Sequence, residues 1–372
     1  MGESGPRVWA VGEQTSLAER KRRAGQRLIL GLPGPRVDSE FRALVREIRP
    51  AGFILFARNV VEPSQVHELN RELASLVRSD RPTLLTVDQE GGRVQRVQEP
   101  ATCWPSMRCV GERGDATEAV SRGLATELLA MGFNLNFAPV ADVDSNPDNP
   151  VIGDRSFGHK PSEVARHVAA FIKGHQGLGL AACAKHFPGH GDTALDSHHD
   201  LPVVSKTREE LMACEWVPFR EAIRAGVGSI MTAHVVFSAL DPVRPATLSS
   251  KITREVLRED WGFDGVVFSD DLDMKAVADR WSLAEQIRWG TEATVDVFLC
   301  CNQWERQDEA FRTLVLDQEA DPSHEQQAKQ AGARLDQLRA RFLPQPQSPF
   351  DSAEVGCEAH RTLARDLAGG EQ

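Results

Sequence analysis

The chain has 372 residues, a length that suits either two modest domains or one large α/β barrel. Hydrophobic residues make up 41% and the formal net charge is −11, which favours a soluble globular protein and argues against a nucleic-acid partner. Because the sequence contains no tyrosine, a tyrosine nucleophile or acid is excluded.

Eight short apolar runs of β-forming residues recur along the chain, separated by amphipathic intervals. The predicted strands are 27–32, 52–57, 82–88, 134–142, 180–187, 229–236, 265–272 and 295–302. The intervals include the predicted helices 64–77, 116–131, 161–177 and 208–225. A doubly wound two-domain fold would need a linker, and no Ser/Pro/Gly-rich stretch divides the middle of the chain. The alternation therefore predicts a single (β/α)8 barrel of the TIM type.

The two ends differ from the middle. Residues 1–15 are polar and glycine-rich, so we expect a flexible N-terminal segment before a catalytic barrel that spans 16–342. Within the last part of that span, 305–316 and 323–342 have the pattern of charged amphipathic helices. A C-terminal extension, 343–372, follows and holds one more predicted helix. We expect these extra C-terminal helices to cover the barrel rather than to take part in catalysis.

Targeting and redox signals favour a cytoplasmic protein. Residues 1–26 contain no apolar stretch of the roughly 7–15 residues that form the core of a signal peptide. No run approaches the roughly 20 apolar residues of a membrane helix. The seven cysteines are odd in number and lack CxxC spacing, as expected for reduced residues in a core.

Ionisable residues gather where the predicted strands end. Catalytic groups of (β/α)8 enzymes lie at the carboxyl ends of strands and in the loops that follow. Since a buried charge is unfavourable unless it is paired, packing alone explains this pattern poorly. The residues in such positions are Asp88, Asp142, Lys185, His186, His234, Asp270, Asp271 and Asn302.

The segment 185–202, KHFPGHGDTALDSHHDLP, holds four histidines and is the richest in reactive side chains. It is open to three interpretations: acid–base and substrate-binding chemistry, a metal site, or a solvated polar loop. Against a metal, the spacing matches neither HxH nor HExxH, and Lys185 would place a like charge beside the ion. Acid–base chemistry is favoured, and a metal-dependent barrel hydrolase is the alternative.

This segment resembles a signature of glycoside hydrolase family 3, in its single-barrel β-N-acetylhexosaminidase branch. Three further segments resemble the family in the same order: DQEGGRVQR (88–96), NLNFAPVADVDSNPDNPVIGDRSFG (134–158) and GVVFSDDLDMKA (265–276). The resemblance extends from about residue 25 to 302, which is most of the chain.

The resemblance implies a role for individual residues. Asp270 matches the catalytic nucleophile, and Asp196 and His198 match a dyad in which the histidine is the general acid/base. A carboxylate at a strand end can form a glycosyl ester, and a histidine can protonate the leaving oxygen and then activate water. Imidazole, with an ordinary pKa of about 6.5, suits neutral pH. The implied sugar-binding residues are Asp88, Arg96, Arg155, Lys185, His186 and, near the same site, His234.

Three segments depart from the family pattern. Residues 103–107 read CWPSM where the family often has Pro-Pro-Met, which predicts an altered active-site wall. Residues 292–296 read EATVD where Ala-Gly-x-Asp is common, and His199-Asp200 replaces the commoner apolar residues after the dyad. None of these departures removes a catalytic group.

Taken together, the resemblance implies a retaining exo-β-N-acetylglucosaminidase that needs neither cofactor nor metal. Its substrate would carry terminal β-linked N-acetylglucosamine, because the bacterial members that the chain resembles trim cell-wall muropeptide fragments during peptidoglycan recycling. Neither nucleic acid nor membrane is an expected partner. Water and phosphate are both open as the acceptor of the glycosyl group. An inactive sugar-binding protein is disfavoured, since it would lack the nucleophile or the dyad.

Overall fold

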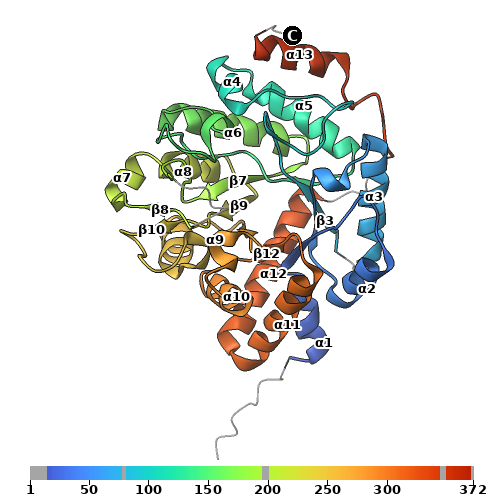
Figure 1. Cartoon of the computed structure of the whole chain (residues 1–372), viewed down its shortest axis with the longest axis vertical. Coiled ribbons are helices and arrows are strands. Elements are labelled where there is room, and N and C mark those ends of the chain that lie inside the picture. The colour runs from blue at the N-terminus through green and yellow to red at the C-terminus, as the bar shows by residue number, and fades with distance from the viewer. Residues whose placement is uncertain (1–14, 78–80, 195–200, 344–348, 370–372) are drawn as a thin grey trace, which may run out of the picture.

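Eight parallel strands close into a barrel, and helices surround it (Figure 1). The structure is a computed structural model that describes residues 15–77, 81–194, 201–343 and 349–369. The barrel strands in chain order are β1 (Leu28–Gly31), β2 (Gly52–Leu55), β3 (Leu84–Val87), β6 (Leu135–Asn136), β7 (Ala181–Phe187), β9 (Ser229–Thr232), β11 (Val266–Asp271) and β12 (Val297–Cys300). Strand β12 pairs with β1, with Leu28 opposite Phe298, and this pairing closes the barrel. Each strand lies within one predicted run, so the predicted (β/α)8 barrel is confirmed.

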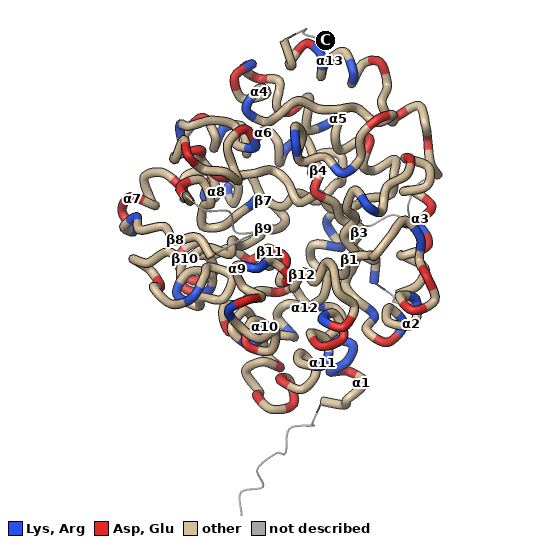
Figure 2. The backbone as a smooth tube through the Cα atoms, viewed as in Figure 1, with Lys and Arg blue, Asp and Glu red and all other residues tan. Residues whose placement is uncertain are grey.

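Burial explains why these runs are apolar throughout. All residues of the barrel strands are buried except Asp270 and Asp271 at the end of β11. Parallel strands covered on both faces need apolar side chains in both directions. One set, including Phe137 and Phe268 in edge-to-face contact at 5.3 Å, fills the barrel interior, and the other packs against the helices. Charged residues lie mainly on the surrounding helices and loops (Figure 2).

Strand β6 is much shorter than its predicted run, although backbone hydrogen bonds continue beyond it, from Phe137 N to Val87 O and from Cys183 N to Ala138 O, each at 2.9 Å. The amide of Asn136 accepts from the main-chain N of Gln89 at 3.0 Å and donates to its carbonyl at 2.9 Å. Asn136 thus ties the end of β6 to the hairpin of β4 (Gln89–Gly91) and β5 (Val94–Gln95), which follows β3. A second small pair, β8 (Val203–Val204) with β10 (Val236–Phe237), is parallel.

The connecting helices follow the predicted intervals closely. They are α1 (Leu17–Gly25), α2 (Ser39–Ile48), α3 (Pro63–Leu76), α4 (Met107–Glu112), α5 (Thr117–Ala130), α6 (Pro161–Gln176), α7 (Arg208–Ala213), α8 (Trp216–Arg224), α9 (Lys275–Ala278), α10 (Leu283–Glu292) and α11 (Trp304–Ala320). Short 3₁₀ turns η1 (Ala57–Asn59), η2 (Gly153–Arg155) and η3 (Ala246–Leu248) and a π-helix, η4 (Ser250–Asp260), complete this set.

The prediction of one continuous helix over 208–225 is wrong. Helix α7 ends at Ala213 and α8 begins at Trp216, and Cys214 between them leaves the helical region with φ −127° and ψ −85°. The next residue, Glu215, is fully buried and its carboxylate accepts from Lys206 and Ser145. The break allows this inward contact, which a surface helix would not offer.

Two helices follow α11. Helix α12 (Pro322–Phe342) places Leu335, Leu338 and Phe342 in the same apolar cluster as the barrel interior. Helix α13 (Glu358–Ala368) lies beside α4 and α5 (Figure 1), where the imidazole Nδ1 of His360 is 2.8 Å from Glu127 Oε1. None of the described helices combines the length and the apolar character that crossing a membrane requires.

Candidate active site

A cavity of about 300 Å³ lies among the carboxyl ends of the barrel strands. Six of the residues implicated by the sequence line it, namely Asp88, Arg96, Arg155, Lys185, His186 and Asp270. Apolar side chains, including those of Phe56, Met231 and Met274, line it as well. A larger surface hollow of about 610 Å³ lies along α3 and holds none of these strand-end groups. The smaller cavity is therefore the candidate site.

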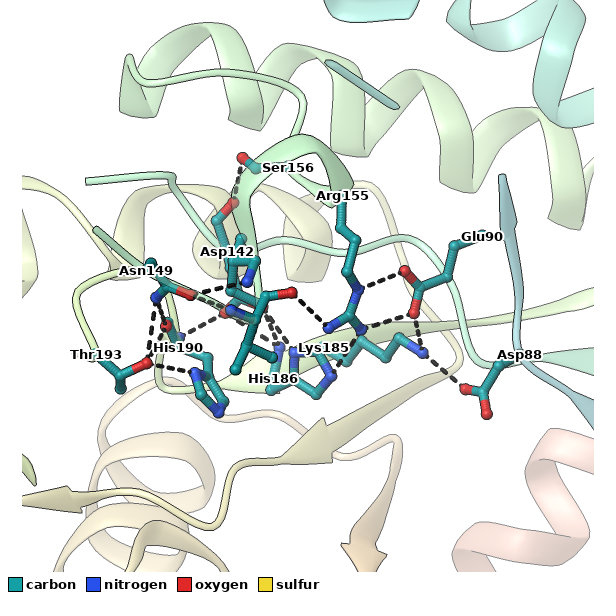
Figure 3. Close-up of polar contacts among 12 residues, drawn as sticks. Asp88, Glu90, Asp142, Asn149, Arg155, Ser156, Lys185, His186, His190 and Thr193 are labelled. Atoms are coloured by element: carbon teal, nitrogen blue, oxygen red, sulfur yellow. Dashed lines mark hydrogen bonds and ion pairs between the residues drawn. The ribbon is translucent and has the colours of Figure 1, made fainter. Parts of the chain in front are cut away.

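One wall of the cavity is a network of paired charges (Figure 3). Arg155 in η2 donates from Nε and Nη2 to the two carboxylate oxygens of Glu90, at 2.9 and 2.8 Å. Lys185 Nζ lies 2.6 Å from Glu90 Oε1 and 2.7 Å from Asp88 Oδ1. Arg96 Nη2 is 3.5 Å from the other oxygen of Asp88. Three cations and two carboxylates thus alternate along the wall.

The pairing keeps Glu90 and Lys185 ionised although both are buried. Burial alone would raise the pKa of Glu90, but the charges of Arg155 and Lys185 outweigh it and hold that pKa far below its usual range. Burial would likewise lower the pKa of Lys185, but Asp88 and Glu90 raise it. Lysine has three N–H donors, and two of them go to the carboxylates of Asp88 and Glu90, which leaves one donor for a ligand.

A further carboxylate, that of Asp142, fixes the orientation of His186. Asp142 is fully buried, and its Oδ2 lies 2.7 Å from His186 Nδ1. Its Oδ1 accepts from the main-chain N of His190 at 2.6 Å. With Nδ1–H donated to Asp142, the Nε2 atom of His186 is turned toward Arg155, 3.4 Å from Nη2, as an acceptor in the cavity wall (Figure 3).

His190 also lines the cavity, and its surroundings favour the neutral ring. Burial, with a smaller contribution from the charge of His186, lowers the pKa of His190 to about 4. Its Nδ1 lies 2.9 Å from Thr193 Oγ1, and its carbonyl accepts from Asn149 Nδ2 at 2.8 Å. His190 is therefore a neutral polar group at physiological pH rather than a cation.

The end of β11 turns two consecutive carboxylates toward the cavity. Successive residues of a regular strand point to opposite faces, but the register between β11 and β12 shifts between Phe268 and Asp271. This irregularity lets both Asp270 and Asp271 line the cavity. Asp270 is partly exposed, and its Oδ1 accepts from the main-chain N of Asp271 at 2.8 Å.

The two carboxyl groups differ in their environment. Asp271 accepts from Cys301 N at 3.2 Å and from Asn302 Nδ2 at 3.1 Å, and both of these donors come directly after β12 in the chain. Burial, together with the charges of Asp273 and Asp270, raises the pKa of Asp271 to about 7. Asp271 is therefore held by donors beside β12, and both carboxyl groups are partly exposed.

One predicted site residue, His234, does not line the cavity. His234 is fully buried and is not among the residues that line the cavity. Its Nδ1 is 2.9 Å from Thr247 Oγ1 and its Nε2 is 3.0 Å from the carbonyl of Asp271, so it contacts the main chain of β11. Asp196 and His198 lie outside the described residues, as do His199 and Asp200.

The segments 103–107 and 292–296, which depart from the family pattern, lie outside the lining of the cavity. Trp104 is buried, and its carbonyl accepts from Gly92 N at 2.9 Å beneath the β4–β5 hairpin. Asp296 pairs with Arg258 at 2.6 Å and Arg334 at 3.0 Å, just before β12 begins. The predicted effect of residues 103–107 on the active-site wall stays a prediction.

Sequence reasoning assigned no site role to Glu90, His190 and Asp271, which line the cavity, or to the buried Asp142, which holds His186. A signal existed for Asp142 and Asp271, because each follows an apolar run at a strand end. Glu90 lies two residues beyond Asp88, and its partner Arg155 is distant in sequence.

Among residues 15–77, 81–194, 201–343 and 349–369, no group of three His, Cys, Asp or Glu side chains has the geometry to hold a metal ion.

Comparison with known proteins places this site in a wider context. The family model described as "Glycosyl hydrolase family 3 N terminal domain" matches residues 21–335. A Beta-hexosaminidase of Alkalilimnicola ehrlichii is 41% identical over 295 residues, which cover 77% of this chain and 84% of that protein.

Two solved structures are similar over most of this chain. A glycoside hydrolase family 3 beta-N-acetylglucosaminidase from Paenibacillus sp. str. FPU-7 superimposes with a TM-score of 0.87 at 37% identity, covering 94% of this chain and 68% of that one. NagZ from Neisseria gonorrhoeae, in complex with N-trifluoroacetyl-D-glucosamine, superimposes with a TM-score of 0.73 at 32% identity, covering 92% of this chain and 98% of that one.

Proposed function

The chain belongs to glycosyl hydrolase family 3 and is a glycoside hydrolase, and we propose that it is a retaining exo-β-N-acetylglucosaminidase. One observation carries this proposal: a single cavity brings the accessible carboxyl group of Asp270 to face the charged wall of Arg155, Glu90, Lys185 and Asp88. Its volume of about 300 Å³ is at the lower end of the range for ligand sites, which suits one sugar residue. The names of the similar proteins favour N-acetylglucosamine as that sugar.

The wall would bind the sugar through complementary hydrogen bonds. Arg155, Lys185 and Arg96 supply N–H donors to hydroxyl groups and to the acetamido oxygen, and Asp88 accepts from a hydroxyl. Because Glu90 and Asp142 already hold Arg155, Lys185 and His186 in place, little side-chain freedom is lost when the sugar binds. Phe56, which is partly buried and lines the cavity, adds apolar surface for a pyranose ring.

The chemistry would take two displacement steps. In the first, a carboxylate oxygen of Asp270 bonds to the anomeric carbon, the glycosidic C–O bond breaks, and His198 gives its proton to the leaving oxygen. In the second, His198 takes a proton from water, the water oxygen bonds to the anomeric carbon, and the bond to Asp270 breaks. Asp196 would orient the imidazole and stabilise its charged form, as a carboxylate does behind other catalytic histidines.

For the natural substrate we propose cell-wall muropeptide fragments with a terminal β-linked N-acetylglucosamine, processed in the cytoplasm during peptidoglycan recycling. The support is the resemblance of four motifs to bacterial enzymes of that role. A cavity that suits one sugar is consistent with removal of single terminal residues.

A panel of aryl β-glycosides tests the proposal, with N-acetylglucosamine, glucose and galactose as the sugar. We expect turnover of the N-acetylglucosamine substrate, with the β-anomer as the first product because two inversions retain configuration. Repeating the assay with added phosphate distinguishes hydrolysis from transfer to phosphate. An α-anomer as first product, or equal turnover of all three sugars, would contradict the proposal.

A further inference from the structure

The segment that carries Asp196 and His198 is anchored on its N-terminal side by neutral hydrogen bonds. Thr193 Oγ1 contacts His190 Nδ1 at 2.9 Å and the His190 carbonyl at 3.1 Å (Figure 3). Asn149 Nδ2 donates to the same carbonyl at 2.8 Å and to Thr193 Oγ1 at 3.1 Å. These contacts attach residues 190–193 to the loop that follows β6.

On its C-terminal side, the chain rejoins the barrel through β8. Val236 N donates to Pro202 O at 2.9 Å, and Ser238 N donates to Val204 O at 3.0 Å. These bonds attach residues 202–204 to the loop that follows β9. The two anchors belong to different βα units, so a side chain that joins them directly adds a further constraint on the two ends of the segment.

Lys206 connects the two sides. Its Nζ lies 3.1 Å from Asp192 Oδ1 across the segment and 2.6 Å from Glu215 Oε1. It also donates to Ser145 Oγ at 3.3 Å, and Ser145 itself donates to Glu215 Oε1 at 2.9 Å. Burial would lower the pKa of Lys206, but hydrogen bonds and charge from Glu215 and Asp192 raise it, so the amine is cationic at neutral pH.

Glu215 holds this lysine from a fully buried position. A buried carboxylate is unfavourable without a partner, and Oε2 of Glu215 has no hydrogen-bond partner among the described residues. The chain approaches it closely: a Cβ on Gly189, whose φ is +132°, would lie 2.6 Å from Glu215 Cβ. Gly189 leaves room for the side chain of Glu215, and the break between α7 and α8 places Glu215 where it contacts Lys206.

We propose that Asp192, Lys206 and Glu215 form a charged clasp that fixes the separation of the two ends of 193–205 and thereby positions the acid/base dyad. The three are positioning residues, because none of them lines the cavity. This inference rests on the proposed function, in which His198 gives the proton to the leaving oxygen. A general acid must be held in reach of that oxygen, and a shift of about 1 Å can reduce a rate about 100-fold.

The test compares two leaving groups in Lys206→Met. We expect kcat/KM for a disaccharide with a sugar leaving group to fall about 10- to 100-fold. With nitrophenyl β-N-acetylglucosaminide, whose leaving group needs no proton, we expect a fall of less than about threefold. Lys206→Arg keeps the charge and should recover most of the loss. Lys173→Met is the matched control, since it breaks an exposed 2.8 Å pair with Glu118 and should leave both values unchanged.

Asp192→Asn is the second variant, and it decides the matter if Lys206→Met fails to fold. It weakens only the contact across the segment and keeps the Lys206–Glu215 pair, so it should show the same dependence on leaving group. Equal losses on both substrates, or no loss, would overturn the clasp. His198→Ala is assayed in parallel. If His198→Ala shows the dependence and the clasp variants do not, only the clasp is rejected. If His198→Ala lacks it, the proposed acid is rejected and the clasp with it.

Discussion

Replacing Glu90 with glutamine tests the charged wall of the cavity. Glu90 is 2% exposed and accepts from Arg155 at 2.8 and 2.9 Å and from Lys185 at 2.6 Å. Glutamine keeps the shape, but it removes the shared negative charge and turns an NH₂ group toward cationic donors. Because breaking a buried ion pair costs about 3–5 kcal/mol, we expect the free energy of unfolding at pH 7 to fall by about that amount.

The pH dependence of this difference follows from the depressed pKa of Glu90. In the unfolded chain the carboxyl group has a pKa of about 4.3, and in the folded protein the pKa is lower. The stabilisation by Glu90 is therefore fully present above about pH 4.3, and it declines as the pH falls toward the folded pKa. The difference between wild type and Glu90→Gln should stay constant from about pH 6 to 8 and shrink below about pH 4.3.

Urea unfolding of both proteins across this pH range measures the difference. The control is Glu118→Gln, which removes the partner of the exposed Lys173 and should change the unfolding free energy by no more than about 0.5 kcal/mol. Two results would refute the reasoning: a Glu90→Gln protein as stable as wild type at pH 7, or a difference that is as large at about pH 3 as at about pH 7.

Four further predictions concern the reaction. Asp270→Ala should abolish turnover without unfolding the protein, and a slow fluorinated substrate should leave a covalent sugar on Asp270 within peptide 265–275; mass spectrometry that finds the label on a different residue would reject the nucleophile. Arg155→Ala should lower kcat/KM about tenfold or more, because about 1.4 kcal/mol of lost binding corresponds to a factor of ten; an unchanged value in steady-state kinetics would mean that the sugar binds elsewhere. His198→Ala should be far more damaging with a sugar leaving group than with nitrophenyl, since a general acid contributes about 10²–10⁴-fold only where a proton is needed; the same defect confined to His199→Ala would reassign the acid. Exhaustive chelation should leave activity unchanged, whereas loss that a divalent ion restores would favour a metal-dependent mechanism.

Local sequence patterns were sufficient for the architecture and for much of the candidate site. Strands buried on both faces must be apolar throughout, so each appears as a continuous run, and parallel connection brings all their carboxyl ends to one mouth. That rule alone gathers Asp88, Lys185 and Asp270 in one place. The assignment of sugar-binding roles to Arg96 and Arg155, which lie on loops, depended instead on the motif resemblance.

The tertiary structure decided which partner each charge has. Glu90 binds Arg155 and Asp142 binds His186, although 65 and 44 residues separate the members of these pairs. Hydrophobic periodicity reports only which face of an element is buried, whereas a buried charge is paired by whatever the closed barrel brings within about 3 Å. For the same reason, neither the shift in register that turns Asp271 into the cavity nor the break that buries Glu215 has a local signature. Each exists because of a contact with a distant segment.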